Sequence, residues 1–159
     1  MVKRILSPVV LILLLSVCVS AQETQTSDDV AIRQIIQYYF DGSKNNNVSL
    51  LKKAFHPEAK SLGLAQSNGN GLREIKVART YVNIEGRDPI NLIGRIVSID
   101  VTGRAALVKT EMQYPEGILD SPPPGVIDTE YLSLLKFGEG WRIVSRISFP
   151  KKTNLTSPK

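Results

Sequence analysis

The spacing of apolar residues changes partway along this chain, and that change limits the folds open to it. In the first half, apolar side chains recur at helical spacing, as in the set Ile32, Ile35, Ile36, Tyr39 and Phe40. From about residue 93 onward they alternate with polar ones, which is the period of a strand with one buried face. Helices followed by a run of long strands predict an α+β domain, with the helices packed on one face of a curved antiparallel sheet.

Two helices are expected at the start of this domain. The first begins at Ser27, whose hydroxyl can cap free backbone N–H groups, and stops at Gly42. The second carries the apolar residues of the segment 50–55 at the same spacing. It ends before Pro57, because the residue preceding a proline is driven out of the helical conformation.

The rest of the chain is expected to form turns, strands and one more helix. Residues 68–71 (NGNG) predict a turn in an irregular strand pair, and residues 74–84 predict a third helix. Alternating runs on either side of Thr102-Gly103 predict a long antiparallel hairpin, and residues 115–126, with three consecutive prolines at 122–124, predict a projecting loop. With no internal repeat, the simplest division is one domain over residues 28–150.

Side-chain directions follow from the alternation. In the first strand of the hairpin, one face is expected to hold Ile93, Val97, Ile99 and Val101. In the last strand, Trp141, Ile143, Ile147 and Phe149 are expected to share a face. Arg142 and Arg146 are then expected to point the other way.

Residues 1–21 have the order of a removable export signal. Lys3 and Arg4 precede a short apolar run, and a small-residue site follows it. We expect cleavage between Ala21 and Gln22, a loose polar leader over 22–27, and a protein that works in the periplasm or is secreted. The apolar run is shorter than the roughly 20 residues of a comfortable membrane span, although an uncleaved anchor remains an alternative.

Removal of this segment changes what the chain can do. It takes two of the 20 basic residues and leaves 18 against 15 acidic ones, so the charge is modest and gives no reason to expect nucleic-acid binding. It also removes Cys18, the only cysteine, which excludes disulfides and thiol catalysis. Lipidation at Cys18 is the third alternative, but Val17 stands where a lipoprotein signal has a small residue. The tail 151–159 reads as a solvated basic end.

Four segments carry a resemblance to a known superfamily: YYFDGSKNN, FHPEAK, RIVSIDVTGRAALVKTEM and YLSLLKFGEGWRIVSRISF. In this order across residues 28–149 the chain resembles the nuclear transport factor 2-like superfamily (SnoaL-like), and within it the Putative lumazine-binding group of small exported bacterial domains. The resemblance implies a cystatin-like cone, a bent sheet around the N-terminal helices with a cavity between them. It also implies a small, partly apolar ligand or a homodimer formed through the sheet.

The same resemblance implies where catalytic groups would lie. The ketosteroid isomerase branch of the superfamily uses an Asp base with a Tyr and a protonated Asp. Tyr39 falls near the tyrosine position, but the base position falls near Gly63 or Leu64 and the second acid near Ser133. Two of the three roles are empty, so no isomerase of that type is expected.

Four side chains are the candidates for ligand binding. Tyr39, Tyr114 and Tyr131 each offer a flat apolar body with a hydroxyl, which suits a small ligand, although ordinary packing explains them equally well. His56 is the only histidine, so metal sites with two histidines are excluded within one chain, and no cofactor is predicted. Its competing interpretation is a helix-end residue that satisfies local backbone groups.

Three functions remain open from the sequence. The first is an exported, noncatalytic cone that binds a small molecule or forms a homodimer. The second is an isomerase or lyase that uses Tyr39 and His56 for proton transfer, which requires both in one pocket. The third is a protein-interaction module that uses the proline loop at 121–125.

Overall fold

The computed structural model describes residues 27–64, 71–114 and 126–152. The predicted export signal, with its cleavage point between Ala21 and Gln22, lies outside the described residues, as does the proline loop at 121–125. In the described ranges no helix is long and apolar enough to cross a membrane.

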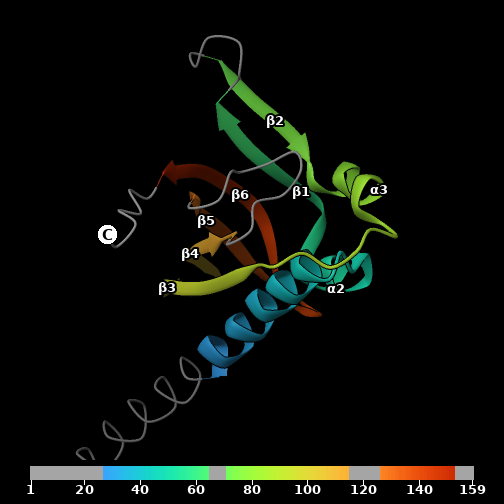
Figure 1. Ribbon diagram of the computed structural model, residues 1–159. Helices are drawn as coiled ribbons and strands as arrows, with labels where there is room; N and C mark the ends of the chain where they lie inside the picture. Colours follow the sequence, from blue (N-terminus) through green and yellow to red (C-terminus); the bar gives the residue numbers. More distant parts are fainter. Residues whose placement is uncertain (1–26, 65–70, 115–125, 153–159) are drawn as a thin grey trace, which may run out of the picture.

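The described strands form a six-stranded mixed sheet in the order β2-β1-β6-β5-β4-β3. Their bounds are β1 Phe55–Leu64, β2 Leu72–Lys76, β3 Ile93–Thr102, β4 Ala105–Gln113, β5 Val126–Phe137 and β6 Gly140–Lys152. Figure 1 shows the sheet bending around the N-terminal helix, with the β1–β2 hairpin extending past the other strands. The predicted α+β architecture is confirmed.

One pair of strands departs from the predicted antiparallel sheet. β1 and β6 run parallel, whereas every other neighbouring pair is antiparallel. The prediction is wrong here because β1 enters the sheet directly from a helix and not through a hairpin with β6. A parallel neighbour requires a long crossover connection, and the chain between β1 and β6 supplies one.

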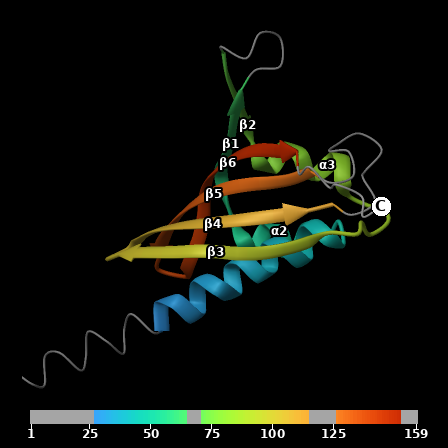
Figure 2. The same ribbon diagram turned by 60° about the vertical axis from the view of Figure 1, so that its left-hand side comes forward.

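The N-terminal helix spans residues 27–44 in the described chain and lies across the inner face of the sheet (Figure 2). Its predicted apolar stripe is confirmed, since all five members are at most 9% exposed: Ile32, Ile35, Ile36, Tyr39 and Phe40. Ser27 is itself helical and is therefore not the cap that the sequence suggested. The stripe fixes which side of the helix faces the sheet.

Gly42 does not end this helix. The helix continues to residue 44, and the left-handed conformation of Asn46, with φ of 49°, is where the chain turns away. Gly42 has a packing role, because a Cβ atom at this position would lie 2.8 Å from Leu51 Cδ2 and 3.0 Å from the Leu51 backbone nitrogen. Glycine lets the second helix approach the first.

Replacing Gly42 by alanine is expected to destabilise the protein, against the general preference of helices for alanine. The added methyl group must displace Leu51, and overpacking of this kind lowers the free energy of unfolding by about 1–3 kcal/mol. Urea denaturation of Gly42→Ala measures the effect, and Gly63→Ala is the control, since nothing lies within 4 Å of its added Cβ. An increase in stability for Gly42→Ala would contradict the close packing.

Helix α2 (Val48–Ala54) ends one residue earlier than the apolar spacing suggested. The side chain of Asn47 caps its start by accepting a hydrogen bond from the Leu50 N–H at 3.2 Å. Phe55 is the first residue of β1, so the segment from Phe55 onward is extended. His56 therefore belongs to a strand and not to a helix end.

The third predicted helix is shorter than expected. Residues 74–76 belong to β2, and the helical part consists of a 3₁₀ turn at Val77–Thr80 followed by α3 at Tyr81–Ile84. Pairing of β2 with β1 overrides the local helical spacing at 74–76. Val77 and Tyr81 are the buried residues of the two helical pieces.

Two β-bulges reverse the side-chain directions expected from simple alternation. In β3, Ile96 pairs with Thr110 and Ser98 pairs with Lys109, so Val97 is an extra residue. Val97 is 41% exposed as a result, and Ile93 on the far side of the bulge also lies outside. The prediction that Ile93 and Val97 share a face with Ile99 and Val101 is therefore wrong.

The second bulge lies in β6 at Val144. Ser145 pairs with Ser133 and Ile143 pairs with Leu134, which leaves Val144 without a counterpart. Beyond the bulge, Ile147 and Phe149 lie on the exposed outer face, and Arg146 is paired with the fully buried Leu132 on the inner face. The predicted directions of Ile147, Phe149 and Arg146 are all reversed by this one residue.

A buried contact fastens the N-terminal helix to the β5–β6 end of the sheet. The Asp28 carboxylate accepts hydrogen bonds from the Lys136 ammonium at 2.6 Å and from Trp141 Nε1 at 3.0 Å, both at Oδ1. Lys136 and then Trp141 hold the pKa of Asp28 below its ordinary value. The indole of Trp141 is 2% exposed and forms the base of the core at this end.

Candidate functional site

The inner face of β5 changes from apolar to polar along its length. Leu132 and Leu134 are at most 1% exposed and pack in the core. Asp128 and Glu130 continue the same face toward the start of the strand, because alternate residues of a strand point to the same side. Glu130 therefore lies in the interior beside the apolar core, and the half-buried Asp128 follows it on the same face.

Glu130 is 1% exposed and is surrounded by hydrogen-bond donors. The Tyr39 hydroxyl, from the N-terminal helix, lies 2.7 Å from each of its carboxylate oxygens. The Thr110 hydroxyl, from β4, lies 3.3 Å from Oε2. The carboxylate is thus held by groups from two other elements, as a buried charge requires.

Arg146 supplies the opposite charge. Its Nη1 donates to the Tyr39 hydroxyl at 3.0 Å and lies 3.5 Å from Glu130 Oε1. Its Nε and Nη2 donate to the hydroxyl of Ser61 on β1 at 3.2 and 3.1 Å. The Arg146 side chain keeps 27% exposure while that of Glu130 keeps 2%, so the arginine is the more open end of the ion pair.

We call this group of side chains the inner polar cluster: Tyr39, Ser61, Thr110, Asp128, Glu130 and Arg146. Burial raises the pKa of Glu130, and Arg146 opposes that rise by favouring the ionised form. Burial, and then the charge of Glu130, raise the pKa of Tyr39 well above its ordinary value. Tyr39 is therefore a neutral hydroxyl at physiological pH, able to donate to the carboxylate.

Among the described residues, Asp128 is the member of the cluster with an unpaired oxygen. Its Oδ1 atom is buried and has no hydrogen-bond partner in residues 27–64, 71–114 and 126–152. Burial raises its pKa, against the influence of Arg146. An oxygen in this condition is rare in native interiors, because desolvation without a partner is unfavourable.

Tyr39 and Tyr114 are the two predicted residues that the structure brings together. Their hydroxyls lie 3.6 and 3.7 Å from the sulfur of Met112, which is 1% exposed and stands opposite Asp128 in the β4–β5 ladder. Burial, followed by the charges of Glu130 and Asp128, raises the pKa of Tyr114. Tyr114 therefore borders the inner polar cluster.

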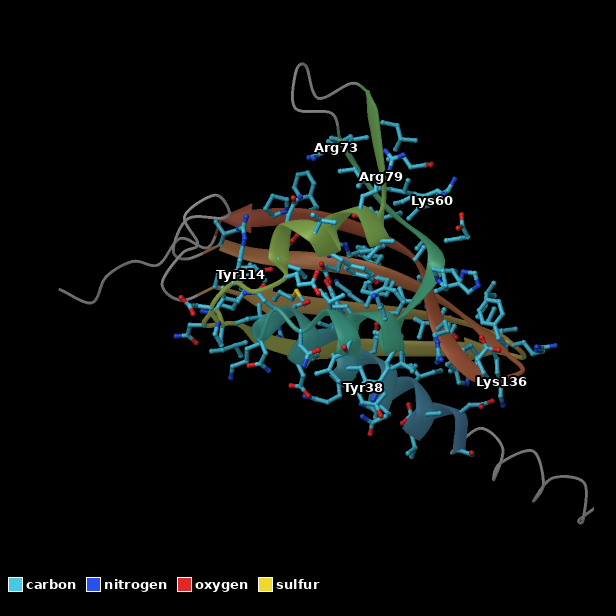
Figure 3. All side chains as sticks on the ribbon, turned by 90° about the vertical axis from the view of Figure 1, so that its right-hand side faces the viewer. Tyr38, Lys60, Arg73, Arg79, Tyr114 and Lys136 are labelled. Carbon is cyan, nitrogen blue, oxygen red and sulfur yellow. The ribbon has the colours of Figure 1, made fainter. Side chains whose placement is uncertain are left out.

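The other two predicted residues lie elsewhere. His56 stacks on Phe137 with ring centroids 4.8 Å apart, and its Nδ1 accepts a hydrogen bond from the Glu58 N–H at 3.2 Å. Phe137 is seven positions along β5 from Glu130, or roughly 20 Å of strand. Figure 3 shows the same separation, with Tyr114 and Lys136, the neighbour of Phe137, at opposite ends of the sheet.

Tyr131 lies on the outer face of the sheet. It is 43% exposed, and the ammonium of Lys109, its partner across β4 and β5, lies 5.6 Å from its ring centroid. Around it the same face carries four more apolar side chains that are 42–61% exposed: Leu107, Leu135, Ile147 and Phe149. This outer apolar face is separate from the inner polar cluster.

Sequence reasoning missed the acidic and basic members of the cluster. A signal for Asp128 and Glu130 was present, since both alternate in step with Leu132 and Leu134 and so share their buried face. Arg146 carried no such signal, because the bulge at Val144 places it on the face opposite to the one that alternation predicts.

In the described ranges no group of three or more His, Cys, Asp or Glu side chains could hold a metal ion.

Solved structures with the same architecture include an NTF2-like protein of unknown function from Shewanella baltica, with a TM-score of 0.65 and 22% identity over 80% of this chain and 97% of that one. An NTF-2 like protein from Silicibacter pomeroyi has a TM-score of 0.64 and 17% identity over 80% and 98%. A cystatin-like domain from Nostoc punctiforme has a TM-score of 0.57 and 16% identity over 81% and 80%. These likenesses establish the NTF2-like, cystatin-like fold.

Sequence comparison adds a family. The family described as "Putative lumazine-binding" matches residues 27–147, which include every member of the inner polar cluster. Comparison with curated proteins finds no match.

Proposed function

The chain belongs to the Putative lumazine-binding family, and from this premise we propose that it binds a small, partly apolar molecule at the inner polar cluster without transforming it. The observation that carries the proposal is the Glu130 carboxylate, 1% exposed and joined to Tyr39 and Arg146 inside the domain. A buried ion pair stabilises a fold no better than apolar residues of the same size. An interior ion pair that adds little stability is a candidate for ligand recognition, which supports the proposal.

The hydrogen bonds of Glu130 and Tyr39 favour a binding role over a catalytic one for these two residues. Both oxygens of Glu130 accept hydrogen bonds, and the Tyr39 hydroxyl is held between Glu130 and Arg146. These groups are fixed donors and acceptors, whereas a general base needs an oxygen free to take a proton. The alternative isomerase or lyase, built on Tyr39 and His56, requires the two in one pocket, and they contact different ends of the sheet.

Calorimetric titration of the purified full chain with lumazine and related planar heterocycles tests the proposal. We expect saturable binding to the wild-type protein and a loss of at least tenfold in affinity for Glu130→Gln, which keeps the shape and removes the charge. Glu111→Gln, on the outer face, is the matched control and should bind as the wild type does. Absence of saturable binding across the panel, or equal binding by Glu130→Gln, would overturn the proposal.

The outer apolar face supports a second proposal, that two copies of the chain associate through their sheets. Five exposed apolar side chains lie together on one surface, and contiguous exposed apolar patches mark sites of protein–protein contact. On the same face β4 carries Lys109 and Glu111, two residues apart, so a two-fold arrangement would set opposite charges against each other. This arrangement of charges supports a second copy of this chain as the partner.

Sedimentation equilibrium measures this association directly. We expect a dimer for the wild-type chain and a monomer for Ile147→Lys, because the substitution puts a charge in the middle of the face opposite Tyr131. Val82→Lys, at a side chain that is 81% exposed on α3, is the control and should remain dimeric. A weak interface has a dissociation constant on the order of 100 micromolar. A wild-type chain that is still monomeric at that concentration would therefore contradict the proposal.

We also propose that the protein is exported, on the sequence of residues 1–21. Expression of the full gene with its own N-terminus should yield a protein that starts at Gln22 outside the cytoplasm. Mass spectrometry of the recovered chain distinguishes cleavage from an uncleaved anchor and from lipidation at Cys18.

A further inference from the structure

The inner polar cluster contains one more negative charge than its hydrogen bonds account for. Arg146 supplies the charge opposite to Glu130, and its guanidinium donates its other described hydrogen bonds to the hydroxyls of Tyr39 and Ser61. The charge of Arg146 also acts on Asp128 and opposes the rise of its pKa, yet the buried Oδ1 of Asp128 has no hydrogen-bond partner in the part of the chain that the structure describes. Both oxygens of Glu130 therefore have hydrogen-bond partners, whereas Oδ1 of Asp128 has none among the described residues.

The position of Asp128 suits contact with a ligand. Along β5 it lies two residues from Glu130, or about 7 Å, on the same inner face. Met112 stands opposite it, and the Tyr114 and Tyr39 hydroxyls flank the Met112 sulfur. Met112 and Tyr39 are at most 2% exposed, whereas Asp128 and Tyr114 are half-buried, so a ligand would meet this group from the side of Asp128 and Tyr114. The polarizable thioether lies behind that contact.

We propose that Asp128 recognises the ligand of this cluster by accepting a hydrogen bond from an N–H group of a planar nitrogen heterocycle. The inference rests on the proposed ligand-binding function and adds a requirement to it, that the ligand carries an N–H group. A carboxylate only accepts hydrogen bonds, so it selects a ligand donor and rejects a carbonyl oxygen placed at the same point. Contact with the ligand supplies the partner that Oδ1 lacks.

Two heterocycles of nearly the same shape test this requirement. Lumazine carries ring N–H groups, and 1,3-dimethyllumazine has methyl groups in their place. For the wild-type full chain we expect lumazine to bind about 10–100-fold more tightly, the range of a charge-assisted hydrogen bond. For Asp128→Ala, which removes the acceptor and leaves room for the methyl groups, we expect the two affinities to converge. Asp100→Ala, an exposed position on β3, is the matched control and should keep the wild-type preference.

The stability of the free protein gives a second readout. Desolvation of the unpaired Oδ1 opposes folding, so Asp128→Asn should raise the melting temperature of the ligand-free chain by a few degrees while weakening lumazine binding. A fall of several degrees would mean that Asp128 has a structural role and would overturn the inference.

The outcomes separate this inference from the proposed function. If Asp128→Ala retains the preference for lumazine while Glu130→Gln loses binding, the cluster binds a ligand but Asp128 does not recognise its N–H group. If the wild-type chain binds neither heterocycle nor any other member of the panel, the proposed function fails and the inference fails with it.

Discussion

Arg146→Met is expected to lower the free energy of unfolding by about 3 kcal/mol at pH 7. Methionine fills much of the same volume but leaves Glu130, whose side chain is 2% exposed, without its opposite charge. An uncompensated buried charge is among the most destabilising changes in a protein interior. Urea denaturation of the variant and the wild type gives the difference.

The difference in free energy of unfolding between Arg146→Met and the wild type should become smaller as the pH falls. Burial raises the pKa of Glu130, and the loss of Arg146 removes the influence that opposes that rise. A carboxyl whose pKa is higher in the folded than in the unfolded state stabilises the fold when protonated, and this contribution is lost as the pH rises through the interval between the two values. Denaturation at pH 5 should therefore show a smaller difference than at pH 7.

Two further variants check the cause. Arg146→Met combined with Glu130→Gln should recover most of the lost stability, because residue 130 then carries no charge that needs a partner. Arg95→Met makes the same chemical change at a side chain that is 67% exposed and paired with Glu111, and should cost less than about 1 kcal/mol. A deficit for Arg146→Met that is the same at both pH values would show that lost packing, and not charge, is responsible.

Tyr39→Ala should lower the free energy of unfolding by about 3–5 kcal/mol, the range for deleting a buried aromatic ring. The ring is 2% exposed and lies edge-on against Phe55, with centroids 5.2 Å apart. Its removal leaves a cavity between the N-terminal helix and the sheet, and also deprives Glu130 of its shortest hydrogen bonds.

Tyr39→Phe separates these two contributions. The ring remains, so the expected loss is that of one charge-assisted hydroxyl contact, about 1–3 kcal/mol. Tyr38→Phe, one residue earlier and outside the cluster, is the control and should be nearly neutral. Chemical denaturation of the three variants measures each effect, and equal losses for Tyr39→Ala and Tyr39→Phe would contradict the packing role of the ring.

Local periodicity predicted the elements whose environment repeats along the chain. The stripe from Ile32 to Phe40 and the hairpin on either side of Gly103 keep one period throughout, and both are confirmed. The β1–β2 pair is confirmed as well, but its full length was not predicted. Phe55 and His56 are extended because β1 pairs with β6, far away in the sequence, and a local window contains no trace of that partner.

The candidate site was harder to predict than the fold. One inserted residue at Val144 exchanges the two faces of β6, so Arg146 could not be placed inside without the pairing register. Glu130 was recoverable from its alternation with Leu132, because a carboxylate in step with core leucines is unusual enough to mark a site. Tyr39 was found because its helix keeps a regular stripe.

The parallel pairing of β1 with β6 also affects the order in which the domain can form. Ser61 and Arg146 are 85 positions apart in the sequence, and Tyr39 and Arg146 are 107 apart. Contacts across such long loops are the slow ones in folding, because the loop must close before they stabilise anything. During synthesis on the ribosome, β1 therefore has one unpaired edge until β6 has been made. The inner polar cluster can form only when β6 has paired with that edge.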